Sequence, residues 1–146
     1  MKNRFWVIGL LWLAFPLPTA RADLGFWSAR LVGTWRHPKH GDQYQFRSDA
    51  TYTFWAGASK RRAGNLSHRG FWKVVAPTFK ESGGSQEGPV ALLLKSTSRV
   101  VLEAKKPRVL RSQRVFRIVS DTIRSKEGMI DPNRYRIGGA TWRRAN

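Results

Sequence analysis

Apolar and polar positions alternate with a period of two along much of the chain, which is typical of strands that bury one face. The alternation is strictest in residues 43–47 and 51–55, and Ser48-Asp49-Ala50 between them predicts a tight hairpin turn. Asp131-Pro132-Asn133 predicts a further turn. Other stretches predict strands at residues 31–36, 70–75, 90–94, 99–104, 115–119, 135–137 and 141–143. No helix longer than two turns is expected. About eight short strands separated by turns predict an all-β fold, a single antiparallel up-and-down barrel or sandwich.

In such a barrel one face of every strand points to the interior. An eight-stranded barrel is just wide enough to be filled by side chains or to hold one small ligand. The residues expected to line a possible lumen are the large aromatic side chains Tyr44, Phe46, Tyr52, Phe54 and Trp72. The periodicity favours a packed core, and a cavity for a small apolar ligand stays open as the alternative.

The stretch LVGTW at residues 31–35, followed by an alternating hairpin, resembles the first strand of the calycin barrels: lipocalins, fatty-acid-binding proteins and avidins. The wider pattern LVGTWR…YQFRSDATYTFW…GFWKV…VFRIVSDTI…YRI is similar to small exported lipocalin-like domains of bacteria. The resemblance implies that Trp35 closes one end of the barrel beneath an arginine from the last strand. Arg143 is the first candidate for that arginine, and Arg136 is the second.

The first hairpin turn departs from this resemblance. Domains of this kind commonly carry Asp-Gly in the turn, whereas this chain has Asp49-Ala50. A type I′ turn needs a positive φ at both central residues, which alanine disfavours. The turn is therefore expected to be of another type or to be strained.

The first 22 residues predict a signal peptide and not part of the fold. A basic start is followed by an apolar run from Phe5 to Leu17, and Ala20-Arg21-Ala22 fits the small-x-small rule for cleavage. We therefore expect residues 1–22 to be the leader, residues 23–146 to be one barrel domain, and the protein to be secreted or periplasmic. The chain has no cysteine, so the domain must fold by packing without disulfides.

The candidate chemistry points to binding without catalysis. Of the nine acidic residues, Asp42, Asp49, Asp121 and Asp131 stand in turn contexts, and there is no Gly-x-Ser-x-Gly motif for a serine nucleophile. His37-Pro38-Lys39-His40 with Asp42 supplies fewer ligands than a closed metal site needs. We expect no enzymatic activity, no metal and no cofactor.

Charge is the strongest functional signal. The formal net charge is +18, and removal of Lys2, Arg4 and Arg21 with the leader leaves +15. That surplus exceeds the magnitude of about 2–8 that solubility needs in a small domain. The residues expected to bind anions are Lys60, Arg61, Arg62, Arg69, Lys105, Lys106, Arg108 and Arg111. We expect the partner to be an anionic polymer or lipid head groups. Two alternatives stay open: the charge only keeps the protein soluble, or the barrel carries or senses a small apolar ligand in its interior.

Overall fold

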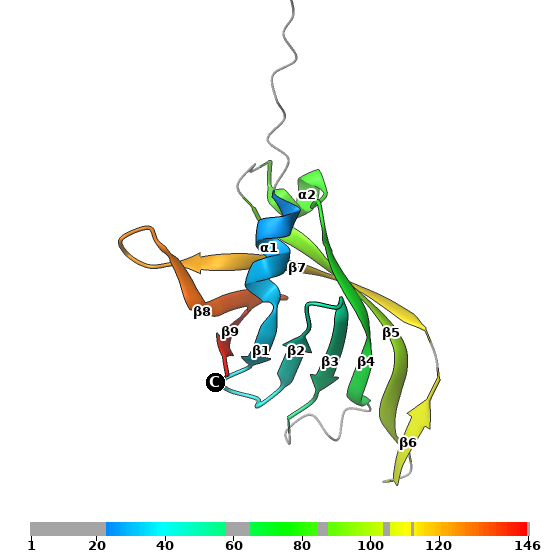
Figure 1. Ribbon diagram of the computed structural model, residues 1–146. Coiled ribbons are helices and arrows are strands. Elements are labelled where there is room, and N and C mark those ends of the chain that lie inside the picture. The colour runs from blue at the N-terminus through cyan, green and yellow to red at the C-terminus, as the bar shows by residue number, and fades with distance from the viewer. Residues whose placement is uncertain (1–22, 58–64, 85–87, 104–105, 112, 146) are drawn as a thin grey trace, which may run out of the picture.

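The computed structural model describes residues 23–57, 65–84, 88–103, 106–111 and 113–145. Its elements in chain order are α1 (Leu24–Leu31), β1 (Gly33–Arg36), β2 (Gln43–Phe46), β3 (Thr51–Trp55), β4 (Asn65–Val75), α2 (Phe79–Ser82), β5 (Val90–Glu103), β6 (Lys106–Leu110), β7 (Arg114–Arg124), β8 (Ile130–Ile137) and β9 (Ala140–Arg144). Every strand pairing is antiparallel. The strands β1-β2-β3-β4-β5-β7-β8-β9 form a ring that closes between β9 and β1. The prediction of an all-β antiparallel up-and-down barrel is confirmed (Figure 1).

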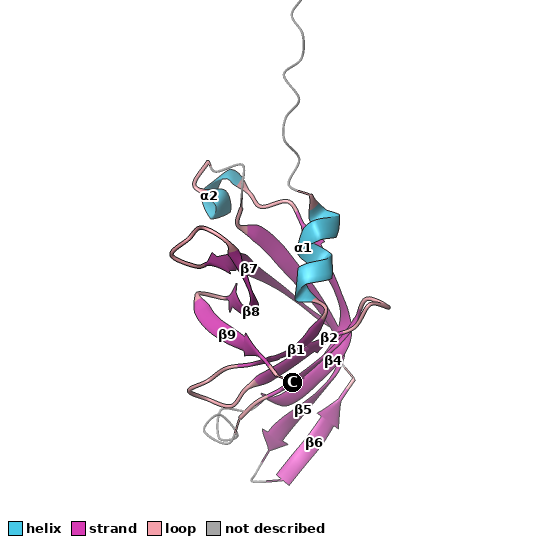
Figure 2. Cartoon of the chain, turned by 60° about the vertical axis from the view of Figure 1, so that its left-hand side comes forward, coloured by secondary structure: helices cyan, strands magenta, loops and turns pink. Residues whose placement is uncertain are grey.

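Strands β4 and β5 form one long hairpin in the middle of the chain. Residues 90–94 and 99–104 were expected to be two strands, but β5 joins residues 90–94 and 99–103 in one strand, and residue 104 lies outside the described residues. One edge of β5 pairs with β4; the other edge pairs with β7 along 90–96 and with β6 along 99–103. Strands β6 and β7 therefore lie one after the other along the same edge of β5. The β5–β6 hairpin extends past the rest of the barrel (Figures 1 and 2).

The predicted turn at Ser48-Asp49-Ala50 is confirmed, and it is not of type I′. The Ala50 N–H donates to the Arg47 carbonyl, and the Arg47 N–H donates to the Thr51 carbonyl. Among the described residues, Ala50 is the one non-glycine residue with a positive φ, at 64°. A type I turn followed by a single left-handed residue is the usual form of a three-residue hairpin loop.

The predicted turn at Asp131-Pro132-Asn133 is wrong, because these residues lie within β8. The chain reverses earlier, where the Ser125 N–H donates to the Met129 carbonyl. Pairing between β7 and β8 is irregular opposite residues 131–133. A proline is tolerated in a strand at such an irregularity, because no ladder hydrogen bond is required from its nitrogen.

Aromatic side chains fill the barrel interior. Of the residues expected to line a lumen, Tyr44, Phe46, Tyr52 and Trp72 are buried, and Phe54 is half-buried against them. The Tyr44 ring lies 5.2 Å from the Phe46 ring and 4.6 Å from the Phe54 ring, measured between centroids. The Phe46 ring lies 5.2 Å from the Trp72 ring. These separations are those of directly packed aromatic pairs.

Helix α1 covers one end of the barrel. It is a little over two turns long and was not predicted. Asp23 caps it, since its carboxylate accepts a hydrogen bond of 3.1 Å from the Phe26 N–H. Trp27 and Leu31 are buried, and Trp27 packs edge-on against Tyr135. Within the described ranges, no helix has the length and apolar character needed to cross a membrane.

Candidate functional site

The covered end of the barrel is closed by Trp35 and an arginine, as the resemblance implied, but the arginine is Arg144. Its guanidinium carbon lies 4.4 Å from the centroid of the Trp35 ring. The same guanidinium donates to the carbonyls of Val32 (2.9 Å), Arg30 (3.1 Å) and Pro132 (3.1 Å). It therefore joins β9 to the end of α1, to the start of β1 and to β8.

The first and second candidates, Arg143 and Arg136, are both exposed. The reason is strand alternation. Trp142 is buried, so Arg143 must point outward and Arg144 inward. Arg144 is also the direct pairing partner of Trp35 in the β1–β9 ladder. In the sequence, Trp142 stands two positions before Arg144, so the two side chains lie on the same side of the strand. An inward Trp142 therefore identifies Arg144 as the inward arginine.

The structure explains why the Gly-Thr-Trp motif begins with a glycine, Gly33. Its φ is 136°, a backbone conformation that residues other than glycine rarely adopt. A Cβ placed there would overlap the Nη1 atom of Arg144. The glycine thus leaves the space that the arginine needs to reach the face of Trp35. This end of the barrel has a structural role.

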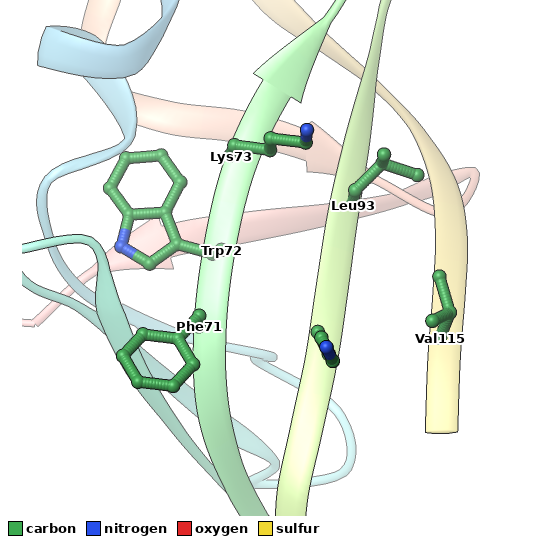
Figure 3. A pocket seen from close by; sticks show the side chains of 6 residues that line it. Phe71, Trp72, Lys73, Leu93 and Val115 are labelled. Atoms are coloured by element: carbon green, nitrogen blue, oxygen red, sulfur yellow. The ribbon is translucent and has the colours of Figure 1, made fainter. Parts of the chain in front are cut away.

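The surface with recognition chemistry is the outer wall of the barrel across β4, β5 and β7. A groove of about 270 Å³ lies there (Figure 3). We define its outward-pointing residues as the basic–apolar face: Phe71, Lys73, Leu93, Lys95 and Val115. Phe71 is 54% exposed and Val115 is 68% exposed. Large apolar side chains exposed together on one surface mark interaction sites more often than single exposed ones do.

Strand register brings these five residues together. Lys95 of β5 pairs with Phe71 on one side and with Val115 on the other. Two positions along, Leu93 pairs with Lys73 and with Arg117. Apolar and cationic side chains therefore alternate along each row and between the rows.

A second hollow, of about 290 Å³, lies on the other side of Phe71 and is more polar. Two arginines line it, Arg47 and Arg69, together with threonine side chains. Arg47 donates to Thr53 and Arg69 donates to Ser98, which holds both guanidinium groups over the sheet. Phe71 thus stands between an apolar groove bordered by lysines and a polar hollow bordered by arginines.

The strands beneath this surface carry almost no negative charge. Strands β2, β3 and β4 contain no acidic residue. The acidic residue of β5 is Glu103 at its far end, and that of β7 is Asp121, four residues beyond Arg117. At the border of the face, Arg117 forms a two-pronged salt bridge with Glu81, with both N–O distances 2.7 Å. This contact lowers the pKa of Glu81 to about 2. The face therefore has a positive potential, and the neighbouring carboxylate of Glu81 is already paired with Arg117.

The structure brings only part of the predicted anion-binding set to this surface. Arg69 lies in the polar hollow, and with Trp55 and Val109 it lines a further groove. Lys106 and Arg108 alternate with Val109 along β6, so they point to the opposite side of that strand. Arg111 is exposed just after β6. The remaining four predicted residues lie outside the described residues: Lys60, Arg61, Arg62 and Lys105.

Sequence reasoning missed the outward aromatic rings. Tyr52 and Phe54 were expected to face inward, so Trp55 had to face outward; it is 48% exposed. Phe71 and Trp72 are adjacent, so a strand can bury only one of them, and it buries Trp72. Both signals were present, but Leu93 and Val115 are brought beside Phe71 only by pairing between distant segments.

Inside the barrel, His68 is the one buried histidine of the described chain. Its Nδ1 atom lies 2.8 Å from the Tyr52 hydroxyl, and its ring stacks on those of Phe54 and Phe116. Burial, with a smaller contribution from Arg99, lowers the pKa of His68 to about 4. A neutral, stacked and hydrogen-bonded imidazole is part of the core packing.

The other histidines give no sign of a metal centre. Nδ1 of His37 accepts hydrogen bonds of 3.2 Å from the backbone N–H groups of Lys39 and His40. The described residues contain no group of three or more histidine or acidic side chains placed to hold a metal ion.

In comparisons with known proteins, no family model, curated sequence or solved structure matches this chain.

Proposed function

We propose that this protein is an exported, non-catalytic binding protein of lipocalin-like type that engages an anionic partner through its outer wall. Its place would be the periplasm or the extracellular space, where the partner is an envelope or extracellular component. Residues 1–22 have the pattern of a leader, and Asp23, the first residue after the expected cut, caps the first helix of the barrel. Both features support export of residues 23–146 as one folded domain.

The observation that carries the proposal is the composition of the outer wall. Lysine and arginine side chains stand beside exposed apolar ones, and strands β3 and β4 of this wall contain no acidic residue. A surface made only for solubility would mix both signs of charge and would not gather exposed apolar side chains. Arginine offers a planar fork of donors that suits phosphate, sulfate and carboxylate groups.

The packing of the interior favours the outer wall over the lumen as the binding site. Tyr44 makes ring contacts with Phe46, Phe54 and Trp142 at centroid distances of 4.6–5.2 Å. Side chains of this size occupy the space that an enclosed ligand would need in a barrel of eight strands.

The test is salt-dependent binding to soluble polyanions. The protein is expressed as residues 1–146, purified from the exported fraction and titrated with a sulfated polysaccharide and with a single-stranded oligonucleotide. We expect affinity to fall steeply as salt rises, because each neutralised phosphate or sulfate releases counterions. The triple variant Arg69→Gln, Lys73→Gln, Lys95→Gln should bind more weakly and with a salt slope smaller by about 2–3.

The matched control removes three exposed cations from elsewhere in the fold: Lys39→Gln, Lys126→Gln, Arg143→Gln. It changes the net charge equally and should bind more tightly than the triple variant of the outer wall. Equal losses in both variants would show that only net charge matters and would contradict the proposal. Absence of any polyanion binding in the unmodified protein would contradict it as well.

A further inference from the structure

We infer that the anionic partner of the basic–apolar face is the surface of a phospholipid bilayer. Phe71, Leu93 and Val115 would contact the upper acyl region, and Lys73 and Lys95 would contact the phosphates above it. This inference rests on the proposed function and names the partner for the same surface.

The arrangement around Leu93 is the basis of the inference. Leu93 has Lys73 directly across on β4, and Lys95 follows two residues along β5. Its diagonal neighbours on the adjacent strands include Phe71 and Val115. An apolar centre is thus bordered at close range by lysines, whose long stems can lie along apolar groups while the ammonium reaches upward. A bilayer interface presents the same two layers, phosphate above and acyl chain below.

The two lysines are available to an outside partner. Neither Lys73 nor Lys95 forms an ion pair within the described part of the chain, and both are exposed. Arg117, on the border of the face, is instead held by Glu81. The charge that attracts anions in the groove itself therefore comes from the lysines. An ammonium is a compact point charge that suits a phosphate monoanion in any orientation.

The neighbours of Phe71 favour a bilayer over single-stranded nucleic acid. Nucleic-acid surfaces of this type carry several aromatic rings on which successive bases stack. On the described strands, the other exposed aromatic ring is that of Trp55, which pairs with Ser67, four residues from Phe71 along β4. Four residues of strand span roughly 13 Å. The groove beside Phe71 is completed by the aliphatic side chains Leu93 and Val115, which accept acyl groups and do not stack on bases.

The first experiment measures binding to vesicles of phosphatidylcholine alone and of phosphatidylcholine with about one third phosphatidylglycerol, a fraction that gives a strongly negative surface. We expect binding to the anionic vesicles. The single variants Lys73→Gln and Lys95→Gln should each weaken this binding about fivefold, because the attraction of one lysine to an anionic membrane surface raises the affinity by about that factor. Phe71→Ser should weaken it about tenfold by removing the apolar contact. The controls Lys39→Gln and Met129→Ser change exposed residues away from the face and should have a smaller effect.

The second experiment locates the contact. Because the chain has no cysteine, Val115→Cys introduces a single labelling site for an environment-sensitive fluorophore. The label should shift to shorter wavelength on anionic vesicles and should be quenched by lipids brominated in their acyl chains. A label at Met129→Cys, in the β7–β8 turn, should do neither. Urea unfolding of each variant verifies that the barrel is intact.

The outcomes separate the two proposals. Binding to soluble polyanions that depends on Lys73 and Lys95, without binding to anionic vesicles or without a shift at Val115→Cys, would overturn the bilayer inference and leave the proposed function standing. Equal binding to neutral and anionic vesicles would also overturn it. Failure to bind polyanions and vesicles alike would overturn both proposals.

Discussion

Arg144→Met is the substitution that tests the closed end of the barrel. Methionine keeps much of the apolar stem but removes the guanidinium from the face of Trp35. It also leaves the carbonyls of Arg30, Val32 and Pro132 without their side-chain donor. A cation–π contact contributes about 0.5–2 kcal/mol. A hydrogen bond from a charged group contributes about 1.5–3 kcal/mol, and less where water reaches the partner, as it does at this partly buried site.

Together these contributions predict a loss of about 3 kcal/mol in the free energy of unfolding. For a domain of this length that lowers Tm by about 10 °C. The assay is urea unfolding at neutral pH followed by tryptophan fluorescence, with thermal scans on the same samples. Arg143→Met is the matched control, because it makes the same chemical change at the exposed neighbouring position. It should cost less than about 0.5 kcal/mol. Equal losses for the two variants, or a loss below about 0.5 kcal/mol for Arg144→Met, would refute the role assigned to the guanidinium.

Three further predictions follow from single residues. Gly33→Ala should destabilise the fold by about 2–3 kcal/mol in urea unfolding, because its Cβ would meet Arg144 and its φ is 136°; a change within about 0.5 kcal/mol would contradict this. Ala50→Gly should stabilise the fold by about 0.5–1 kcal/mol, because glycine relieves the left-handed conformation at φ 64° while losing more entropy on folding; an unchanged or lower unfolding midpoint would contradict this. His68 should make stability fall as pH drops from about 6.5 to about 4, since its pKa is about 4 when folded and the unfolded chain takes up the proton first. The loss should reach about 3 kcal/mol across that window and should be missing in His68→Gln; identical pH profiles for the two proteins would contradict it.

Periodicity in the sequence was enough to predict much of the fold. Tyr44, Phe46 and Tyr52 are buried as their alternation predicted, because a strand with one apolar face must turn that face to the core. The same rule, applied from Trp142, would have selected Arg144 over Arg143. The departure from Asp-Gly at Ala50 correctly indicated a turn other than type I′, because the conformation of a tight turn depends on its own few residues.

Contacts between distant segments were beyond the reach of the sequence. Residues 90–94 and 99–103 are one strand only because β4 pairs with both segments along the same edge. Helix α1 is held in place by burial of Trp27 and Leu31 under the barrel end, a contact that its eight residues do not specify. Such a short helix is marginal in water without tertiary packing.

The candidate site divides in the same way. The surplus of positive charge and the outward parity of Phe71 can be derived from the sequence alone, since composition and alternation are local properties. The meeting of Phe71 with Leu93 and Val115 is a product of the β4–β5 and β5–β7 registers. A shift of one residue in either register would turn one strand's apolar side chains away from the groove. Only the closed barrel fixes those registers, because a single set of pairings lets all eight strands bury their apolar faces together.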